Sequence, residues 1–158
     1  MSQKPVTSID VTYNVSLITL DNLPNDIKII ADIFNAIAKE GISIDMVSKS
    51  PALKGNTTIS FSLLYDDLVK AMSSLNKFNN QINNLSIQID SFNTKFCIFG
   101  KNMKNIPGVA ARLFTVLASE GIEVKLVTTS ESDISCLIDE KDADKAAESV
   151  KREFSLND

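Results

Sequence analysis

The chain has 158 residues, of which 44% are hydrophobic, with 16 basic and 20 acidic residues and a formal net charge of −4. This composition predicts one globular domain or two small ones, without a membrane-spanning run of ~20 apolar residues or an apolar signal segment at residues 1–10. It disfavours nucleic-acid binding, which requires a Lys/Arg-rich surface, and the absence of histidine removes the commonest general base and most zinc sites. We therefore expect a cytoplasmic protein that is not itself an enzyme and holds no metal or cofactor.

The first elements are two predicted strands and a helix. Residues 6–11 and 15–20 have the apolar alternation of strands. Apolar residues then recur at helical spacing over residues 30–37. Gly41 follows at the position where a helix favours a left-handed residue, so the helix should end there.

A hairpin, a second helix and a closing strand follow. The apolar period changes to two over residues 42–46 and 59–63, which predicts paired strands joined by a long connection. Helical spacing returns over residues 68–75, with Asp66 as a candidate start. Residues 85–89 form a last strand, so this part of the chain predicts a βαββαβ unit.

The second half of the chain repeats this order. Residues 33–42 recur in pattern 80 positions later as residues 113–122. Gly121 is the counterpart of Gly41. The Asp-rich turn at residues 139–144 lacks the glycine and distal glutamate of a calcium loop, and helix capping explains it better. The predicted elements of this copy are a strand at 95–100, a helix at 110–117, strands at 122–126 and 134–138, and a helix at 143–150.

The repeat predicts an α+β fold of two ferredoxin-like modules, each an antiparallel sheet with its helices on one face. The second copy lacks a closing strand, whereas the N-terminal strand is left over. Our hypothesis is that this strand, at about residues 5–12, completes the second module. The first module, residues 14–92, is then inserted in the second, residues 93–158.

The two cysteines, Cys97 and Cys136, lie in alternating apolar segments. They are interpreted as small buried hydrophobic residues, and a disulfide between them is neither required nor excluded.

Four segments carry a family resemblance: residues 100–114, with Pro-Gly at the turn into a helix, the hairpin residues 127–139, and residues 22–26 and 57–61 in the first copy. Residues 100–114 and 127–139 are similar to the second ACT module of the C-terminal regulatory region of aspartokinases, which is a tandem pair of ACT domains. Residues 22–26 and 57–61 match its first module. Residues 4–9 resemble the segment that leads into the regulatory region, so the resemblance covers almost the whole chain.

The resemblance implies a chain that senses lysine, threonine or both for feedback inhibition of aspartate phosphorylation in aspartate-family amino-acid biosynthesis. It also implies a homodimer formed through the ACT modules and a kinase catalytic domain in the parent protein. That kinase would use ATP and Mg, but its Gly-rich nucleotide site has no counterpart among the five glycines of this chain. The chain is then an excised regulatory fragment or an independently made regulatory subunit.

An amino-acid effector needs N–H donors for its carboxylate and oxygen acceptors for its ammonium, and a strand-to-helix turn provides both. By resemblance, the effector-binding positions of the first module are Leu23, Asn25, Asp26, Ile29, Ile44, Asp45, Met46 and Thr57. Those of the second are Met103, Ile106, Gly108, Val109, Val124, Lys125, Leu126, Thr129 and Ser130.

Structural roles for these residues are the alternative. Asn25 and Asp26 would cap a helix, and the apolar strand residues would belong to a core or an interface. Two positions depart from the family pattern. Ile27-Lys28 replaces Pro-Gly in the first module, so Lys28 either helps to hold a carboxylate or crowds the site. Lys125 would repel a ligand ammonium.

Three other functions are known for the same fold class. A dimerisation module without an occupied ligand site is the main alternative, since paired modules expose sheet edges. Acylphosphatase-like chemistry would need an arginine in a phosphate-binding loop, whereas Arg112 and Arg152 lie on predicted helices. An RNA-recognition module would need basic character and surface aromatic residues on its central strands.

Overall fold

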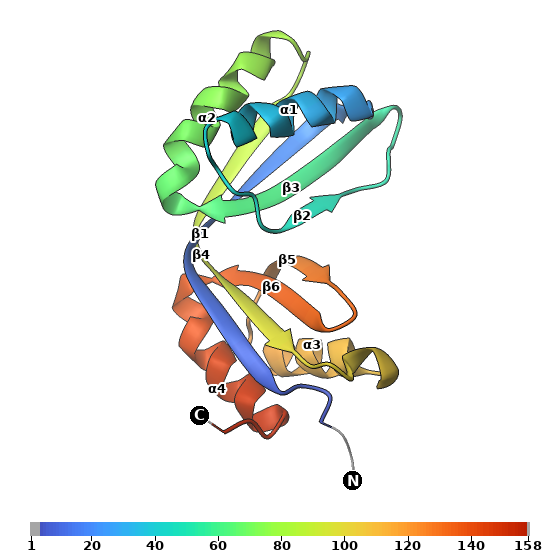
Figure 1. Cartoon of the computed structure of the whole chain (residues 1–158), viewed down its shortest axis with the longest axis vertical. Helices are drawn as coiled ribbons and strands as arrows, with labels where there is room; N and C mark the ends of the chain where they lie inside the picture. The colour runs from blue at the N-terminus through green and yellow to red at the C-terminus, as the bar shows by residue number, and fades with distance from the viewer. Residues whose placement is uncertain (1–3, 158) are drawn as a thin grey trace. The chain divides into compact units, whose positions relative to one another are not determined.

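The structure is a computed structural model that describes residues 4–157. The chain packs into two compact units: an inserted unit, residues 14–91, and a split unit, which comprises the described residues up to 13 and from 92 onward. Each unit combines helices with antiparallel strands, as the α+β prediction requires (Figure 1). The elements are β1 (Ser8–Pro24), α1 (Ile27–Lys39), β2 (Val47–Lys49), β3 (Asn56–Leu64), η1 (Tyr65–Asp67), α2 (Leu68–Asn76), η2 (Lys77–Asn80), β4 (Ser86–Phe99), η3 (Met103–Asn105), α3 (Val109–Ser119), β5 (Val124–Thr129), β6 (Asp133–Asp139), η4 (Glu140–Asp142) and α4 (Ala143–Glu153).

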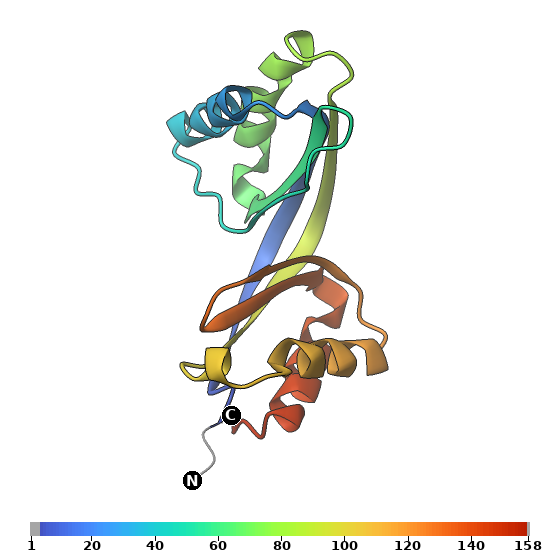
Figure 2. The ribbon, with the colours of Figure 1, turned by 90° about the vertical axis from the view of Figure 1, so that its right-hand side faces the viewer.

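The inserted unit has its strands in the order β2-β3-β1-β4, and α1 and α2 lie on one side of them (Figure 2). β1 and β3 pair antiparallel, with Ile18 opposite Phe61. Alternate residues of both strands point toward the helices, so their apolar side chains form the core. The fully buried members of this core include Ile18, Leu20, Leu23, Ile33, Ile37, Ile59, Phe61 and Leu75.

The split unit has the order β1-β4-β6-β5, and its helices α3 and α4 cover a second core. β4 and β6 pair antiparallel, with Phe96 opposite Cys136. The N-terminal segment is part of this core, because Val6 is fully buried in it and the Thr7 amide donates to the Phe99 carbonyl at 2.8 Å. The other fully buried members include Phe96, Ile98, Leu113, Cys136, Ile138, Ala146 and Val150.

Two of the strands are longer than the sequence predicts. Residues 6–11 and 15–20 were predicted as separate strands, but β1 runs continuously from Ser8 to Pro24, and β4 likewise joins the two strands predicted around residues 85–100. Asn14 and Phe92 have positive φ values of 57° and 64° within these strands. A left-handed residue changes the local side-chain direction without ending the strand, and this is why the apolar alternation is interrupted there.

The first hairpin differs from its prediction in the opposite way. Residues 42–46 are not a regular strand, and β2 begins only at Val47. Ile42 and Met46 are nevertheless buried. The alternation of apolar and polar residues in this segment therefore indicates which side chains are buried, and not that the backbone pairs with a neighbouring strand. The predicted helix ends at Gly41 and Gly121 are confirmed by φ values of 76° and 68°.

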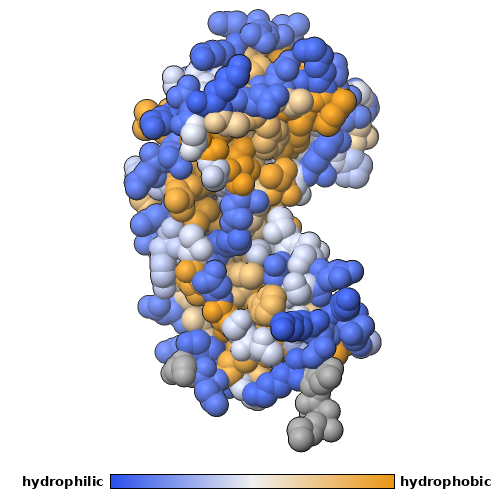
Figure 3. Space-filling model, viewed as in Figure 1, coloured by the Kyte–Doolittle hydropathy of each residue, from blue (hydrophilic) through white to orange (hydrophobic). Residues whose placement is uncertain are grey.

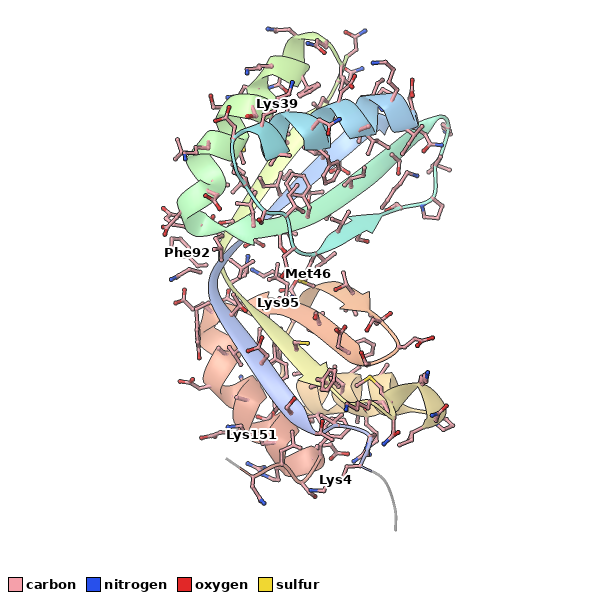
Figure 4. The ribbon with its side chains drawn as sticks, viewed as in Figure 1. Lys4, Lys39, Met46, Phe92, Lys95 and Lys151 are labelled. Carbon is pink, nitrogen blue, oxygen red and sulfur yellow. The ribbon has the colours of Figure 1, made fainter. Side chains whose placement is uncertain are left out.

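The chain crosses closely over itself near its N-terminus. A Cβ atom built on Gly100 would lie 1.8 Å from the Pro5 carbonyl oxygen, so only glycine fits this crossing. Lys4 lies beside the residues that follow α4, and its Nζ donates to the Ser155 carbonyl at 3.0 Å (Figure 4). These contacts fix the N-terminal segment on the split unit.

The Cys136 thiol gives a pH-dependent prediction. Burial, with a smaller contribution from Cys97, raises the pKa of this thiol from 9.0 to about 12. Because the folded pKa is raised, the unfolded chain releases the proton first, and stability falls as the pH rises from 9 toward 12. The expected loss is up to about 1.4 kcal/mol per pH unit above 9.

Urea unfolding at pH 8, 9 and 10 measures this loss. A Cys136→Ala variant should be less stable at every pH but should lose less of its unfolding free energy between pH 9 and 10 than the unsubstituted chain. Cys97→Ala is the control for removal of a thiol that is only partly buried. If the unfolding free energies of all three proteins fell equally between pH 9 and 10, the raised pKa of the Cys136 thiol would be contradicted.

Candidate functional site

A depression of about 340 Å³ in the split unit brings together six of the predicted site residues. It lies where β4 leads through the turn η3 into α3, beside the end of β5. Its predicted residues are Met103, Ile106, Gly108, Val109, Thr129 and Ser130, and Lys104, Ala110, Glu131 and Ile134 complete the lining.

The start of α3 provides the hydrogen-bond donors of this depression. Gly108 is the N-cap residue, with a φ of 86°, and no side chain caps the helix. The first N–H groups of a helix have no partner within the helix, so here they are open to an anionic group. Thr129 and Ser130 add hydroxyl groups, and the Ser130 Oγ accepts from the amides of Ser132 and Asp133 at 3.2 Å.

Charges of both signs lie at the edge of the depression. Lys104 Nζ is 3.5 Å from Glu131 Oε2, and both side chains are exposed. The depression therefore offers N–H donors for a carboxylate and hydroxyl and carboxylate oxygens for an ammonium. This arrangement suits a small zwitterion.

The structure does not bring Val124, Lys125 and Leu126 into this depression. Thr129 is opposite Ile134, whereas Leu126 is opposite Leu137, which places Leu126 about 10 Å further along the strand. Lys125 Nζ donates to Asn93 Oδ1 at 2.7 Å and lies 4.0 Å from Asp139 Oδ2. Its ammonium thus has acceptors within the split unit, away from the start of α3.

In the inserted unit, five predicted residues lie around the start of α1. Leu23 is paired with Thr57, and both are buried. The Asn25 amide donates to the Gly55 carbonyl at 3.0 Å, and Asp26 is the N-cap residue of α1. Ile29 is half-buried against the core.

Ile44, Asp45 and Met46 lie at the other end of the inserted unit. The Asp45 amide donates to the Ser62 carbonyl at 3.1 Å and the Met46 amide donates to the Ser62 Oγ at 3.0 Å. Ser62 is five positions from Thr57 on β3, or about 17 Å. Figure 4 shows Met46 at the end of the unit away from the start of α1.

The two helix starts differ in their capping. The Asp26 Oδ1 accepts from the Lys28 amide at 2.9 Å, so the capping interpretation of Asp26 is confirmed. Lys28 Nζ is paired with Asp32 at 3.0 Å, one turn along α1. The start of α1 is thus occupied by a carboxylate of the chain itself, whereas the start of α3 is open.

Sequence reasoning missed a second depression, of about 750 Å³, in the inserted unit. The available signal is the long connection between the two predicted strands of the first hairpin, residues 50–56, which was predicted only as a connection. Thr57 is the one predicted site residue in its lining. The other lining residues are Asp21, Asn22, Ser50, Pro51, Leu53, Lys54, Asn56, Thr58, Ser86 and Gln88.

Residues 4–157 contain no group of three or more His, Cys, Asp or Glu side chains arranged to hold a metal ion. Within the same range, no helix is long and apolar enough to cross a membrane.

The sequence profile described as "ACT domain" matches residues 96–154, which cover the depression of the split unit. Together with the repeated antiparallel unit and its two helices, this match defines the class: an ACT-domain regulatory protein.

Known relatives define the family more closely. The aspartokinase of Bacillus sp. (strain MGA3) is 35% identical over 143 residues, which cover 90% of this chain and 35% of that protein. The ligand-free regulatory subunit of aspartate kinase from Thermus thermophilus superposes with a TM-score of 0.88 at 26% identity, covering 96% of this chain and 99% of that one. A structure of aspartokinase alpha and beta subunits gives a TM-score of 0.87 at 31% identity, covering 96% and 99%.

The chain belongs to the aspartokinase family, as a C-terminal regulatory ACT region. It spans about a third of the length of the curated aspartokinases that it matches.

Proposed function

We propose that the chain binds a free amino acid, lysine or threonine or both, and that this binding provides feedback inhibition of aspartate phosphorylation. The kinase catalytic domain, with its ATP and Mg, is a separate part of the parent protein or a separate subunit in this proposal. The chain acts as a homodimer through its ACT modules and carries no catalytic residue.

The observation that carries this proposal is the depression at the start of α3. Six residues assigned by resemblance converge there, beside helix N–H groups that no side chain caps. Helix N–H groups favour a carboxylate, and hydroxyl and carboxylate oxygens favour an ammonium. Allosteric control further requires that the effector binds two states of the kinase with different affinities.

Thermal melting tests the binding step, because a ligand that binds only the folded state raises the midpoint. At a hundred times Kd, lysine or threonine should add about 2.7 kcal/mol, which corresponds to about 5–10 °C for a chain of this size. Alanine is the ligand control, and lysine and threonine together test for joint binding.

Two neighbouring threonines provide matched variants for this experiment. Thr129→Val removes a hydroxyl from the depression and should reduce the shift, whereas Thr128→Val, whose residue is outside the lining, should not. Shifts that are equal in both variants would contradict this placement of the site.

A dimerisation module without an occupied ligand site is the second candidate. The observation that favours it is β2, an edge strand of three exposed residues at the end of the inserted unit's strand order. Two results together would favour this function: a stable dimer in sedimentation velocity, and thermal melting midpoints that no amino acid shifts.

A further inference from the structure

The larger depression, on the inserted unit, lies on the face of the strands that points away from α1 and α2. Along β3, Ile59 and Phe61 point into the core, so Thr58 between them points to the opposite face. Asp21 shares this face because its carboxylate bonds to Thr58. Thr58 and Asp21 both line the depression, which is separate from the core of the unit.

Asp21 is held in place from two neighbouring strands. The Thr58 hydroxyl of β3 donates to Asp21 Oδ1 at 2.7 Å, and Gln88 Nε2 of β4 donates to Asp21 Oδ2 at 3.3 Å. Each carboxylate oxygen has two acceptor positions, so one remains on each for a further donor. The carboxylate is therefore fixed before a ligand arrives.

The charge of Asp21 is not balanced by the chain. Within residues 4–157, no basic nitrogen lies within 4.0 Å of its carboxylate, and both of its donors are uncharged. A half-buried, positioned carboxylate without a cation favours a ligand with an ammonium group. A divalent cation fits less well, because Asp21 is the only carboxylate of this lining.

Lys54 supplies the opposite charge on the same depression. It lies in a tight turn in which the Leu53 amide donates to the Asn56 carbonyl at 2.8 Å and the Asn56 amide donates back at 3.1 Å. Lys54 itself has a positive φ of 52°. The turn thus adds a cationic side chain to the same lining as Asp21, without an ion pair to any other described residue.

We propose that this depression is a second binding site for a free α-amino acid, whose ammonium pairs with Asp21 and whose carboxylate faces Lys54. Its volume lies in the ordinary range for small-molecule sites. This inference rests on the proposed function because it takes the class of ligand, a free amino acid, from it. The location of the site is argued independently. It gives the inserted unit a site that does not depend on the start of α1, which Asp26 occupies.

Nitrogen-15 NMR titration of the full chain with L-lysine and L-threonine tests the inference. The amides of Thr58 and Gln88 report the second depression, and those of Gly108 and Ser130 report the first. We expect both pairs to shift with at least one of the two amino acids. Asp21→Asn keeps the size of the side chain and should weaken the response of Thr58 and Gln88 about tenfold or more. It should leave the response of Gly108 and Ser130 unchanged.

Three further proteins or probes sharpen the test. Asp10→Asn removes an exposed carboxylate from the same strand outside the depression and should change neither response. Lys54→Met removes the cation of the turn. Because Lys54 is exposed, this variant should weaken lysine binding at the second depression only several-fold. Cadaverine, which has the side-chain amine of lysine but no carboxylate, should bind more weakly than lysine and be insensitive to Lys54→Met.

The outcomes separate the two proposals. Shifts at Gly108 and Ser130 alone would overturn the second site and leave the proposed function intact. Shifts at Thr58 and Gln88 alone would support the second site and overturn the site at α3. No shift with either amino acid would overturn both. If the second depression is covered by a second copy of the chain, Thr58 and Gln88 will respond to protein concentration instead of amino acid, which also overturns the inference.

Discussion

Replacement of Gly100 by alanine is expected to destabilise the split unit by about 3 kcal/mol or more. The added Cβ would lie 1.8 Å from the Pro5 carbonyl oxygen and 2.8 Å from its carbon, and neither backbone atom can move like the end of a flexible side chain. The N-terminal segment must therefore shift, and Val6 would be drawn out of the core. Urea unfolding, followed by the protection of split-unit amides from hydrogen exchange, measures the loss.

Gly121→Ala is the control for this experiment. A Cβ at Gly121 would meet no atom within 4 Å, but the φ of 68° disfavours any other residue. The expected cost is about 1 kcal/mol, from backbone strain alone. Equal losses in the two variants would show that strain, and not the close crossing with Pro5, dominates at Gly100.

Removal of residues 1–12 is expected to unfold the split unit while the inserted unit stays folded. The deletion removes Val6, Ile9 and Val11 from the split-unit core, together with the strand residues that lie beside β4. A fully buried apolar side chain such as Val6 contributes about 1.5–3 kcal/mol, the partly buried Ile9 and Val11 contribute less, and a whole domain is stable by only about 5–15 kcal/mol. Together with the loss of strand pairing, the deletion therefore removes a large part of the stability of the unit.

Hydrogen exchange read by mass spectrometry distinguishes the two units after this deletion. Peptides from residues 109–154 should lose protection, whereas those from residues 27–76 should keep it. Removal of residues 1–3, which leaves Pro5 and Val6 in place, is the control. Protection lost only from residues 27–76 would overturn the hypothesis that the N-terminal strand completes the second module, and with it the predicted module boundaries at residues 14–92 and 93–158.

The sequence predicted the order of helices and strands well because the apolar pattern repeats. Ile33 and Leu113, 80 positions apart, occupy the same place in two copies of one unit, and both are fully buried. Apolar periodicity reports burial, and burial decides which face of a helix or strand meets a core. It does not report whether backbone pairing continues, so the continuous β1 and the irregular residues 42–46 were missed.

The candidate site was predictable where its residues are close in sequence. Met103, Ile106 and Gly108 lie together because one short turn holds them. Val124 and Leu126 could not be placed, because their distance from that turn depends on the register of β5 against β6. The position of Asp21 depends on partners 37 and 67 residues away, and no local pattern encodes such contacts.

The surface of the inserted unit carries exposed apolar side chains. On the face seen in Figure 3, hydrophobic residues gather in patches over the middle of this unit, and hydrophilic residues lie around its edge. In the inserted unit, Ile27, Leu53 and Val69 are each at least 75% exposed, so the sequence rule that large apolar residues are buried fails at these positions. Exposed apolar residues of this kind are common on folded proteins and do not alone define a function.

The split unit also determines the order in which the chain folds during synthesis. Residues 14–91 are contiguous, so the inserted unit has all its strands and helices as soon as that segment has left the ribosome. The split unit must wait, because Thr7 pairs with Phe99, and the core around Val6 also needs Val150 and Phe154. The part of β1 that precedes residue 14 is therefore among the last segments of the split unit to acquire its full packing. Until α4 is complete, the apolar residues of this N-terminal segment are open to chaperones or to a neighbouring nascent chain.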